Sequence, residues 1–157
     1  MTVTLRTAVE EFVSKEAPKE RVLLESLDGF DDEQTTRLLK RRSKDPLSFG
    51  FAEIATLVTP VVWIAVQEVC RAAAEPAVGA LRRRTGALMR RVLRRPAPAL
   101  TVPPMTAETL EELHGRVCRE ARTAGLEEDA ARALADRVKE HFRPRDPDHP
   151  GEPPERP

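Results

Sequence analysis

The 157-residue sequence contains no tyrosine, and its aromatic residues are five phenylalanines and one tryptophan. Proteins that bind single-stranded nucleic acids usually stack the bases on aromatic side chains, which are scarce here. No helix-turn-helix, RRM or zinc-finger pattern is present either. We therefore predict that nucleic acid is not the partner of this protein.

Cysteine is almost as rare, with Cys70 and Cys118 as the two thiols and no C-x-x-C pair. His114 precedes Cys118 by one helical turn, a spacing that metal ligands use, but no second pair of ligands accompanies them. We predict no metal site and no disulfide. Free thiols and an N-terminus without an apolar signal stretch predict a cytoplasmic location.

Catalytic and cofactor-binding motifs are also missing. The sequence has no G-x-S-x-G nucleophile elbow, no glycine-rich phosphate loop and no H-E-x-x-H zinc motif. His141 lies at the end of the last predicted helix and His149 lies beyond it. Neither has a plausible nucleophile nearby in the sequence. We predict that the protein is not an enzyme and binds no cofactor.

What the sequence does have is helical periodicity. Apolar residues recur every three and four positions in residues 5–13, 110–121 and 130–142, so each stretch predicts an amphipathic helix. Residues 1–45 predict three short helices, with Pro18 beginning the second and Asp31 or Asp32 capping the third. The fold class that follows is all-α.

Proline marks the expected domain organisation. Residues 96–104 contain four prolines and no charge, which predicts a stiff connector between two units. We predict a helical domain over 1–95, a linker over 96–105, an α-helical hairpin over 106–142 and a disordered tail over 143–157. Six prolines among the last fifteen residues are the basis for the tail.

Residues 47–74 form the most apolar part of the chain. Residues 54–67 are a charge-free run of 14, shorter than the roughly 20 residues of a bilayer-spanning helix, and Pro60 interrupts it. Apolar side chains cover most of the helix after Pro60, which predicts burial by protein or by lipid. This area exceeds what the short helices are expected to cover, so we predict a partner or oligomer interface. Its residues are Val61, Val62, Trp63, Ile64, Val66 and Val69.

The next segment, 76–95, is strongly basic. Residues 80–95 contain seven arginines and no acidic residue, in a chain whose net charge is zero. As a helix this segment is amphipathic, with Val78, Leu81, Leu88 and Val92 on one side. The predicted binding surface lies opposite and comprises Arg83, Arg84, Arg90, Arg91, Arg94 and Arg95. It suits an anionic membrane, an acidic protein or the acidic hairpin of the same chain, unless it is simply a solvated face.

Together these features predict a non-enzymatic helical protein that works by binding or assembly. The apolar helices 47–74 and the basic helix 76–95 form the interface with a protein partner or a second copy. The alternative is a membrane-attached protein at the inner face of the membrane. In that case residues 47–74 insert and the arginines contact anionic headgroups.

Overall fold

The computed structural model describes residues 3–44, 57–74 and 98–144. Within these residues the chain forms six α-helices, one 3-10 helix and no strand, which confirms the all-α fold. They are α1 (Leu5–Glu16), η1 (Pro18–Glu20), α2 (Arg21–Glu25), α3 (Asp32–Lys44), α4 (Val58–Ala74), α6 (Ala107–Thr123) and α7 (Glu128–Phe142). The first part of the apolar stretch 47–74, the basic helix 76–95 and all but the first two residues of the tail 143–157 lie outside the described residues.

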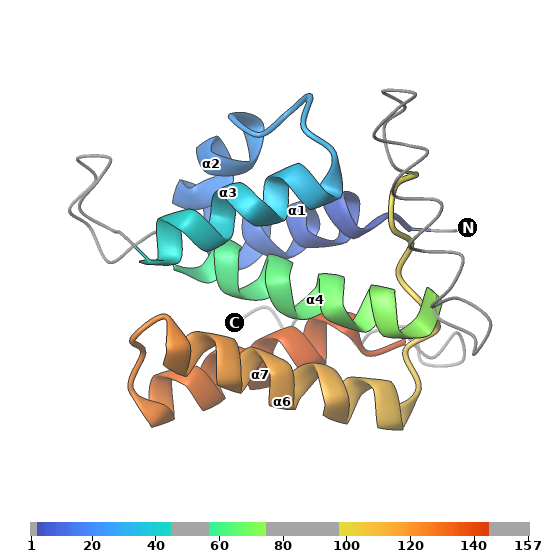
Figure 1. Cartoon of the computed structure of the whole chain (residues 1–157). Helices are drawn as coiled ribbons and strands as arrows, with labels where there is room; N and C mark the ends of the chain where they lie inside the picture. Colours follow the sequence, from blue (N-terminus) through green and yellow to red (C-terminus); the bar gives the residue numbers. More distant parts are fainter. Residues whose placement is uncertain (1–2, 45–56, 75–97, 145–157) are drawn as a thin grey trace, which may run out of the picture.

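Helix α4 lies in the middle of the molecule (Figure 1). Helices α1 and α3 cover one side of it, with α2 packed against α1, and the hairpin of α6 and α7 covers the other side. This arrangement follows from the sequence of α4, because a helix that is apolar over most of its circumference has to be covered on several sides.

Local signals in the sequence begin several of the helices. Asp31 caps α3: its Oδ1 accepts a hydrogen bond from the Gln34 backbone N–H at 2.7 Å, and the Gln34 side chain accepts one from the Asp31 N–H. Pro18 begins η1, directly before α2. Thr106 caps α6: its hydroxyl accepts a hydrogen bond from the Thr109 backbone N–H at 3.2 Å.

The turn between α6 and α7 is a Schellman motif. Gly125 has a φ of 97°, a conformation in which a side chain would be strained. The Leu126 N–H donates to the Ala121 carbonyl at 3.0 Å, and the Gly125 N–H donates to the Arg122 carbonyl at 3.0 Å. These bonds end α6 and direct the chain back as α7, which confirms the predicted hairpin.

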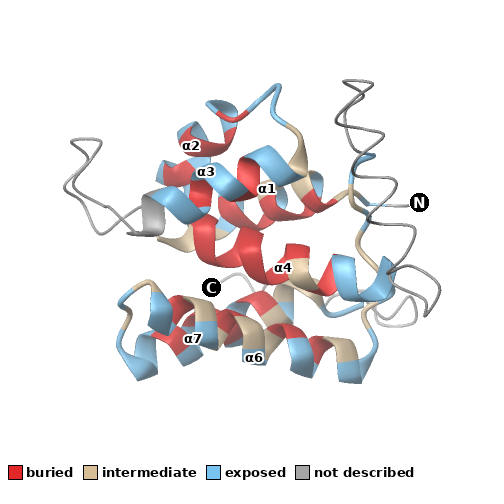
Figure 2. Cartoon of the chain, viewed as in Figure 1, coloured by how far each residue is buried: buried red, intermediate tan, exposed pale blue. Residues whose placement is uncertain are grey.

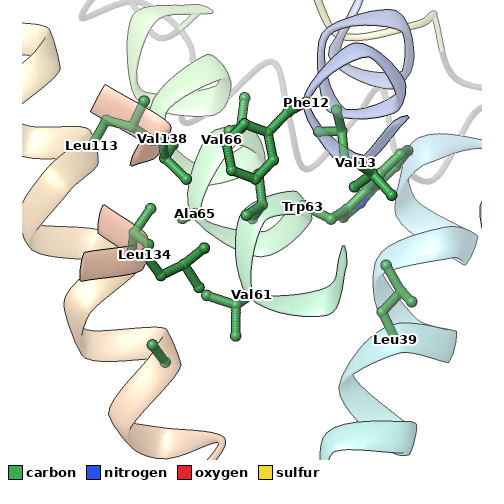
Figure 3. Close-up of a cluster of buried hydrophobic side chains, with 14 of the residues drawn as sticks. Phe12, Val13, Leu39, Val61, Trp63, Ala65, Val66, Leu113, Leu134 and Val138 are labelled. Carbon is green, nitrogen blue, oxygen red and sulfur yellow. The ribbon is translucent and has the colours of Figure 1, made fainter. Parts of the chain in front are cut away.

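One hydrophobic core joins the two predicted units. Burial is concentrated where α4 meets its neighbours on both sides (Figure 2). Phe12 and Val13 from α1 and Leu113, Leu134 and Val138 from the hairpin surround α4 in the same cluster (Figure 3). The hairpin therefore has no core separate from that of the first helices, and a division at residues 96–105 does not describe the packing.

The proline-rich connector is held against the body. Leu100 accepts a hydrogen bond from the Leu5 N–H at 2.8 Å, and the Val102 N–H donates to the Val3 carbonyl at 2.9 Å. These bonds flank an isolated antiparallel bridge between Thr4 and Thr101. The side chains of Leu100, Val102 and Met105 also pack on the core. Residues 98–105 are thus part of the folded body rather than a free linker.

A buried polar network joins α3 to α4. The Trp63 indole N–H donates to the Thr36 hydroxyl at 3.0 Å, and this hydroxyl lies 2.7 Å from both the Asp32 carbonyl and Gln67 Oε1. Gln67 Nε2 donates to the same carbonyl at 3.3 Å. Trp63 and Gln67 are 0% and 2% exposed, so these bonds satisfy polar groups that water does not reach.

Arg6 holds the turn after α2 against this network. Its guanidinium group lies 5.4 Å from the centre of the Trp63 ring, within the range of a cation–π interaction. The same group donates to the carbonyls of Leu27 at 3.3 Å and Phe30 at 3.1 Å. Arg6 on α1 therefore holds the turn between α2 and α3 in place and covers one face of the Trp63 ring.

The start of α4 is capped from a distant part of the chain. The Glu20 carboxylate accepts hydrogen bonds from the backbone N–H groups of Val58 at 3.1 Å and Thr59 at 2.6 Å. An acceptor with negative charge at a helix N-terminus also interacts favourably with the helix dipole. Glu20 is only 2% exposed, and burial raises the pKa of this carboxyl group while the hydrogen bonds from Thr59 and Val58 partly oppose the rise.

Replacing Thr36 by valine tests the network. Thr36→Val keeps the volume but removes the buried partner of the Trp63 N–H and of Gln67 Oε1, so we expect a loss of about 1–3 kcal/mol in the free energy of unfolding. Urea unfolding measures it. Thr36→Ser retains the hydroxyl and should lose clearly less. A valine variant as stable as the wild type would contradict the network.

Replacing Glu20 by glutamine tests the cap through pH. Because the folded-state pKa of Glu20 is raised, its contribution to stability is fully present below the ordinary value of 4.5 and is lost as pH rises through the folded pKa. The stability of the wild type relative to Glu20→Gln should therefore fall as pH increases above 4.5. Urea unfolding of both proteins over a pH series measures this difference, and a difference independent of pH would contradict the buried carboxyl.

Candidate functional site

The six residues predicted as an apolar partner interface are buried in the core of the chain itself. Ile64 is the most exposed of them at 4%. The six are Val61, Val62, Trp63, Ile64, Val66 and Val69. The helices around α4 cover it more completely than the sequence suggested, because the hairpin packs directly on it. These positions therefore offer no surface to a partner, which corrects the predicted interface.

The six arginines of the predicted binding surface lie outside the described residues, so the structure does not place them. They are Arg83, Arg84, Arg90, Arg91, Arg94 and Arg95. What the structure does define is where their segment joins the body. The chain leaves the described part at Ala74, the last residue of α4, and re-enters it at Pro98.

An apolar groove with a volume of about 780 Å3 lies at this junction. The end of α4, the connector and the end of α7 line it. The residues are Val3, Cys70, Ala73, Ala74, Thr101, Val102, Pro103, Pro104, Met105, Phe142 and Pro144. No charged side chain is among them, so the groove suits an apolar ligand surface.

Small side chains and prolines account for the groove. The last turn of α4 carries alanines, whose single methyl groups leave room beside the helix. Pro103 and Pro104 have no N–H, so the pairing of the connector with the N-terminal residues stops at Val102. The chain then turns toward α6 and leaves its apolar side chains along the rim. In the sequence, the alanines at the end of α4 and the paired prolines of the connector are the only signals of the groove. Neither signal shows that these two segments lie side by side.

A second hollow of about 340 Å3 adjoins the first and shares Pro144 with it. Charged side chains line this one, and they pair with each other. Arg137 lies 3.9 Å from Glu16, and Arg143 lies 2.8 Å from Glu140. The residues are Lys15, Glu16, Arg137, Glu140, His141, Arg143 and Pro144. The His141 ring packs edge-on against Phe12 and Phe142, so it contributes to packing at this hollow.

Four of the nine acidic residues of the hairpin pair with an arginine or a lysine. Arg116 pairs with Glu112 at 2.7 Å and with Glu68 of α4 at 2.5 Å. Three further acidic side chains pair with described cations: Glu111 with Lys139, Glu128 with Arg132, and Glu140 with Arg143. Sequence reasoning missed Arg116, which joins the hairpin to α4 through side chains 48 positions apart.

His114 and Cys118 do not form a metal site with other described residues. The His114 Nε2 lies 2.9 Å from Asp136 Oδ1, and the Cys118 thiol points at the Ala131 carbonyl, 4.0 Å away. No group of three His, Cys, Asp or Glu side chains is placed to bind a metal ion in the part of the chain that the structure describes.

Comparison with known proteins finds no matching family model, curated protein or solved structure. Across residues 3–44, 57–74 and 98–144, none of the helices has both the length and the hydropathy needed to cross a membrane.

The two thiols give a test of the groove. Cys70 lines it but is buried, and burial together with the charge of Asp32 raises the pKa of the Cys70 thiol to about 12. Cys118 is only partly buried, although burial raises its pKa as well. At about pH 8, iodoacetamide should label Cys118 at least about tenfold faster than Cys70, because the thiolate is the reactive form. Mass spectrometry of the native protein measures both rates, and equal rates would contradict a buried Cys70.

Proposed function

We propose that the protein is a non-enzymatic binding protein. In this proposal its helical body carries the arginine-rich segment 76–95 as a contact surface for a partner protein with an acidic surface. The arginines that act are those of the predicted surface, from Arg83 to Arg95. The guanidinium group suits this role because it binds carboxylates in a bidentate geometry.

The ion pairs of the hairpin are the observation that supports this proposal. The segment 80–95 has seven arginines and no acidic residue, and the acidic hairpin is the richest source of negative charge that follows it. Five of its nine acidic side chains already lie against described basic side chains: Glu111, Glu112, Glu128, Asp136 and Glu140. At most four acidic side chains of the hairpin are then left for seven arginines, which favours a counter-charge supplied by another molecule.

The core argues against the insertion of residues 47–74 into a membrane. Helix α4 supplies the centre of the core, with Trp63 and Val62 at 0% exposure. Insertion would expose the apolar faces of α1 and of the hairpin, at about 25 cal/mol for each Å2 of apolar area. The membrane alternative therefore reduces to a surface contact between the arginines and anionic headgroups. The experiment below distinguishes this contact from protein binding.

Two matched triple variants test the proposal. Arg83, Arg90 and Arg94 are replaced by glutamine in one, and the exposed Arg41, Arg119 and Arg122 in the other, so that both lose the same charge. The probe is poly-L-glutamate as an acidic polypeptide, measured by titration calorimetry at two salt concentrations. We expect the first triple to bind about tenfold more weakly or worse, since each exposed ion pair contributes up to about 1 kcal/mol. The second triple should bind like the wild type.

Other results would contradict this function. Equal weakening in both triples would show that net charge alone is responsible. No binding of poly-L-glutamate, together with flotation on vesicles of equal parts phosphatidylserine and phosphatidylcholine, would replace the acidic protein by a membrane surface. A mass that increases with concentration in analytical ultracentrifugation would identify the partner as a second copy of the chain.

A further inference from the structure

We propose that the apolar groove at the end of α4 is the docking site for the apolar side of this chain's own segment 75–97, which leaves the arginine side facing outward. The groove is lined by described residues of α4, the connector and α7. This proposal concerns contacts within the chain, so it does not depend on which partner the arginines bind.

The positions at which the segment begins and ends are the first argument. Ala74, which precedes the segment, lines the groove, and so does Thr101, which follows its return at Pro98. The 23 residues of 75–97 are therefore tethered to the rim of the groove at both ends. Tethering makes docking an intramolecular event with a high effective concentration, which a ligand from solution lacks.

Chemical complementarity is the second argument. None of the described residues that line the groove is charged, whereas Leu81, Leu88 and Val92 would share one side of the segment in a helix. A guanidinium group in an apolar groove without a partner would carry a large desolvation cost. The apolar side therefore faces the groove, and the arginines face water.

The size of the groove limits how much of the segment it holds. A volume of about 780 Å3 is that of a pocket for a few apolar groups. A straight helix of 20 residues would be about 30 Å long and would extend beyond such a pocket. Docking therefore involves a part of the segment, and Leu88, near the middle of its apolar side, is the residue we place there.

Native-state proteolysis with trypsin tests the groove side, because trypsin cleaves after the arginines of the segment. The test variant is Ala73→Asp, which puts a charge into the groove, and the control is Ala72→Asp, an exposed neighbour that does not line it. Neither change alters the cleavage sites. We expect Ala73→Asp to speed cleavage within 82–95 by about tenfold or more, because proteolysis follows the undocked population. The control should be cleaved like the wild type.

A second pair of variants tests the segment side. Leu88→Asp adds a charge to the apolar side, and Ala87→Asp adds the same charge to the arginine side at the adjacent position. Only Leu88→Asp should speed cleavage. The free peptide 75–97 gives the rate for an undocked segment, and the wild-type protein should be cleaved clearly more slowly than this peptide.

Three results would overturn the proposal. The first is a wild-type segment that is cleaved as fast as the peptide. The second is a protected segment that neither Ala73→Asp nor Leu88→Asp affects, since its protection would then come from elsewhere. The third is protection that disappears on dilution, which would mean that the groove takes the segment of a second copy.

Discussion

Helix α4 has to be covered almost all the way round, and this constraint organises the molecule. Its apolar side chains occupy most of its circumference, so water is tolerated only along a narrow stripe. Helices α1 and α3 cover it from one side and the α6–α7 hairpin from the other (Figure 1). Two groups of contacts pair polar atoms that burial traps on α4: Trp63 and Gln67 bond with Thr36, and Glu20 caps the first turn. Removing α4 would leave no common core for the remaining helices.

This constraint also decides which surfaces remain for binding. An apolar helix in the sequence suggested a partner interface, but the structure uses the same side chains, Val62 and Trp63 among them, to join its two halves. The arginine-rich segment is different, because residues 80–95 contain no acidic residue and five of the nine hairpin acids already have basic neighbours. For this reason the proposed function places binding on the arginines and not on the apolar helix.

The helices could be predicted from the sequence because their signals are local. The stripe of Leu5, Val9 and Phe12, the cap at Asp31 and the turn at Gly125 each depend on residues within a few positions of one another. Contacts between distant residues could not be predicted in this way. The Glu20 cap of α4 joins residues 38 and 39 positions apart, and no periodicity reveals it. The pairing of the connector could not be predicted for the same reason, since four prolines indicate stiffness but not that Leu100 and Val102 pair with the N-terminal residues.

The connector also links the fold to the proposed binding surface. Asp32, at the start of α3, accepts a hydrogen bond from the Leu100 N–H at 2.7 Å, while its carbonyl takes part in the network of Thr36 and Gln67. Val102, two residues after Leu100, lines the groove near which the chain returns to the body after the arginine-rich segment. Hydrogen bonds with Val3, Leu5 and Asp32 thus hold the connector, which follows the arginine-rich segment, against the body. In the proposed function, a partner bound to the arginines is therefore connected to the core through residues that are themselves fixed on it.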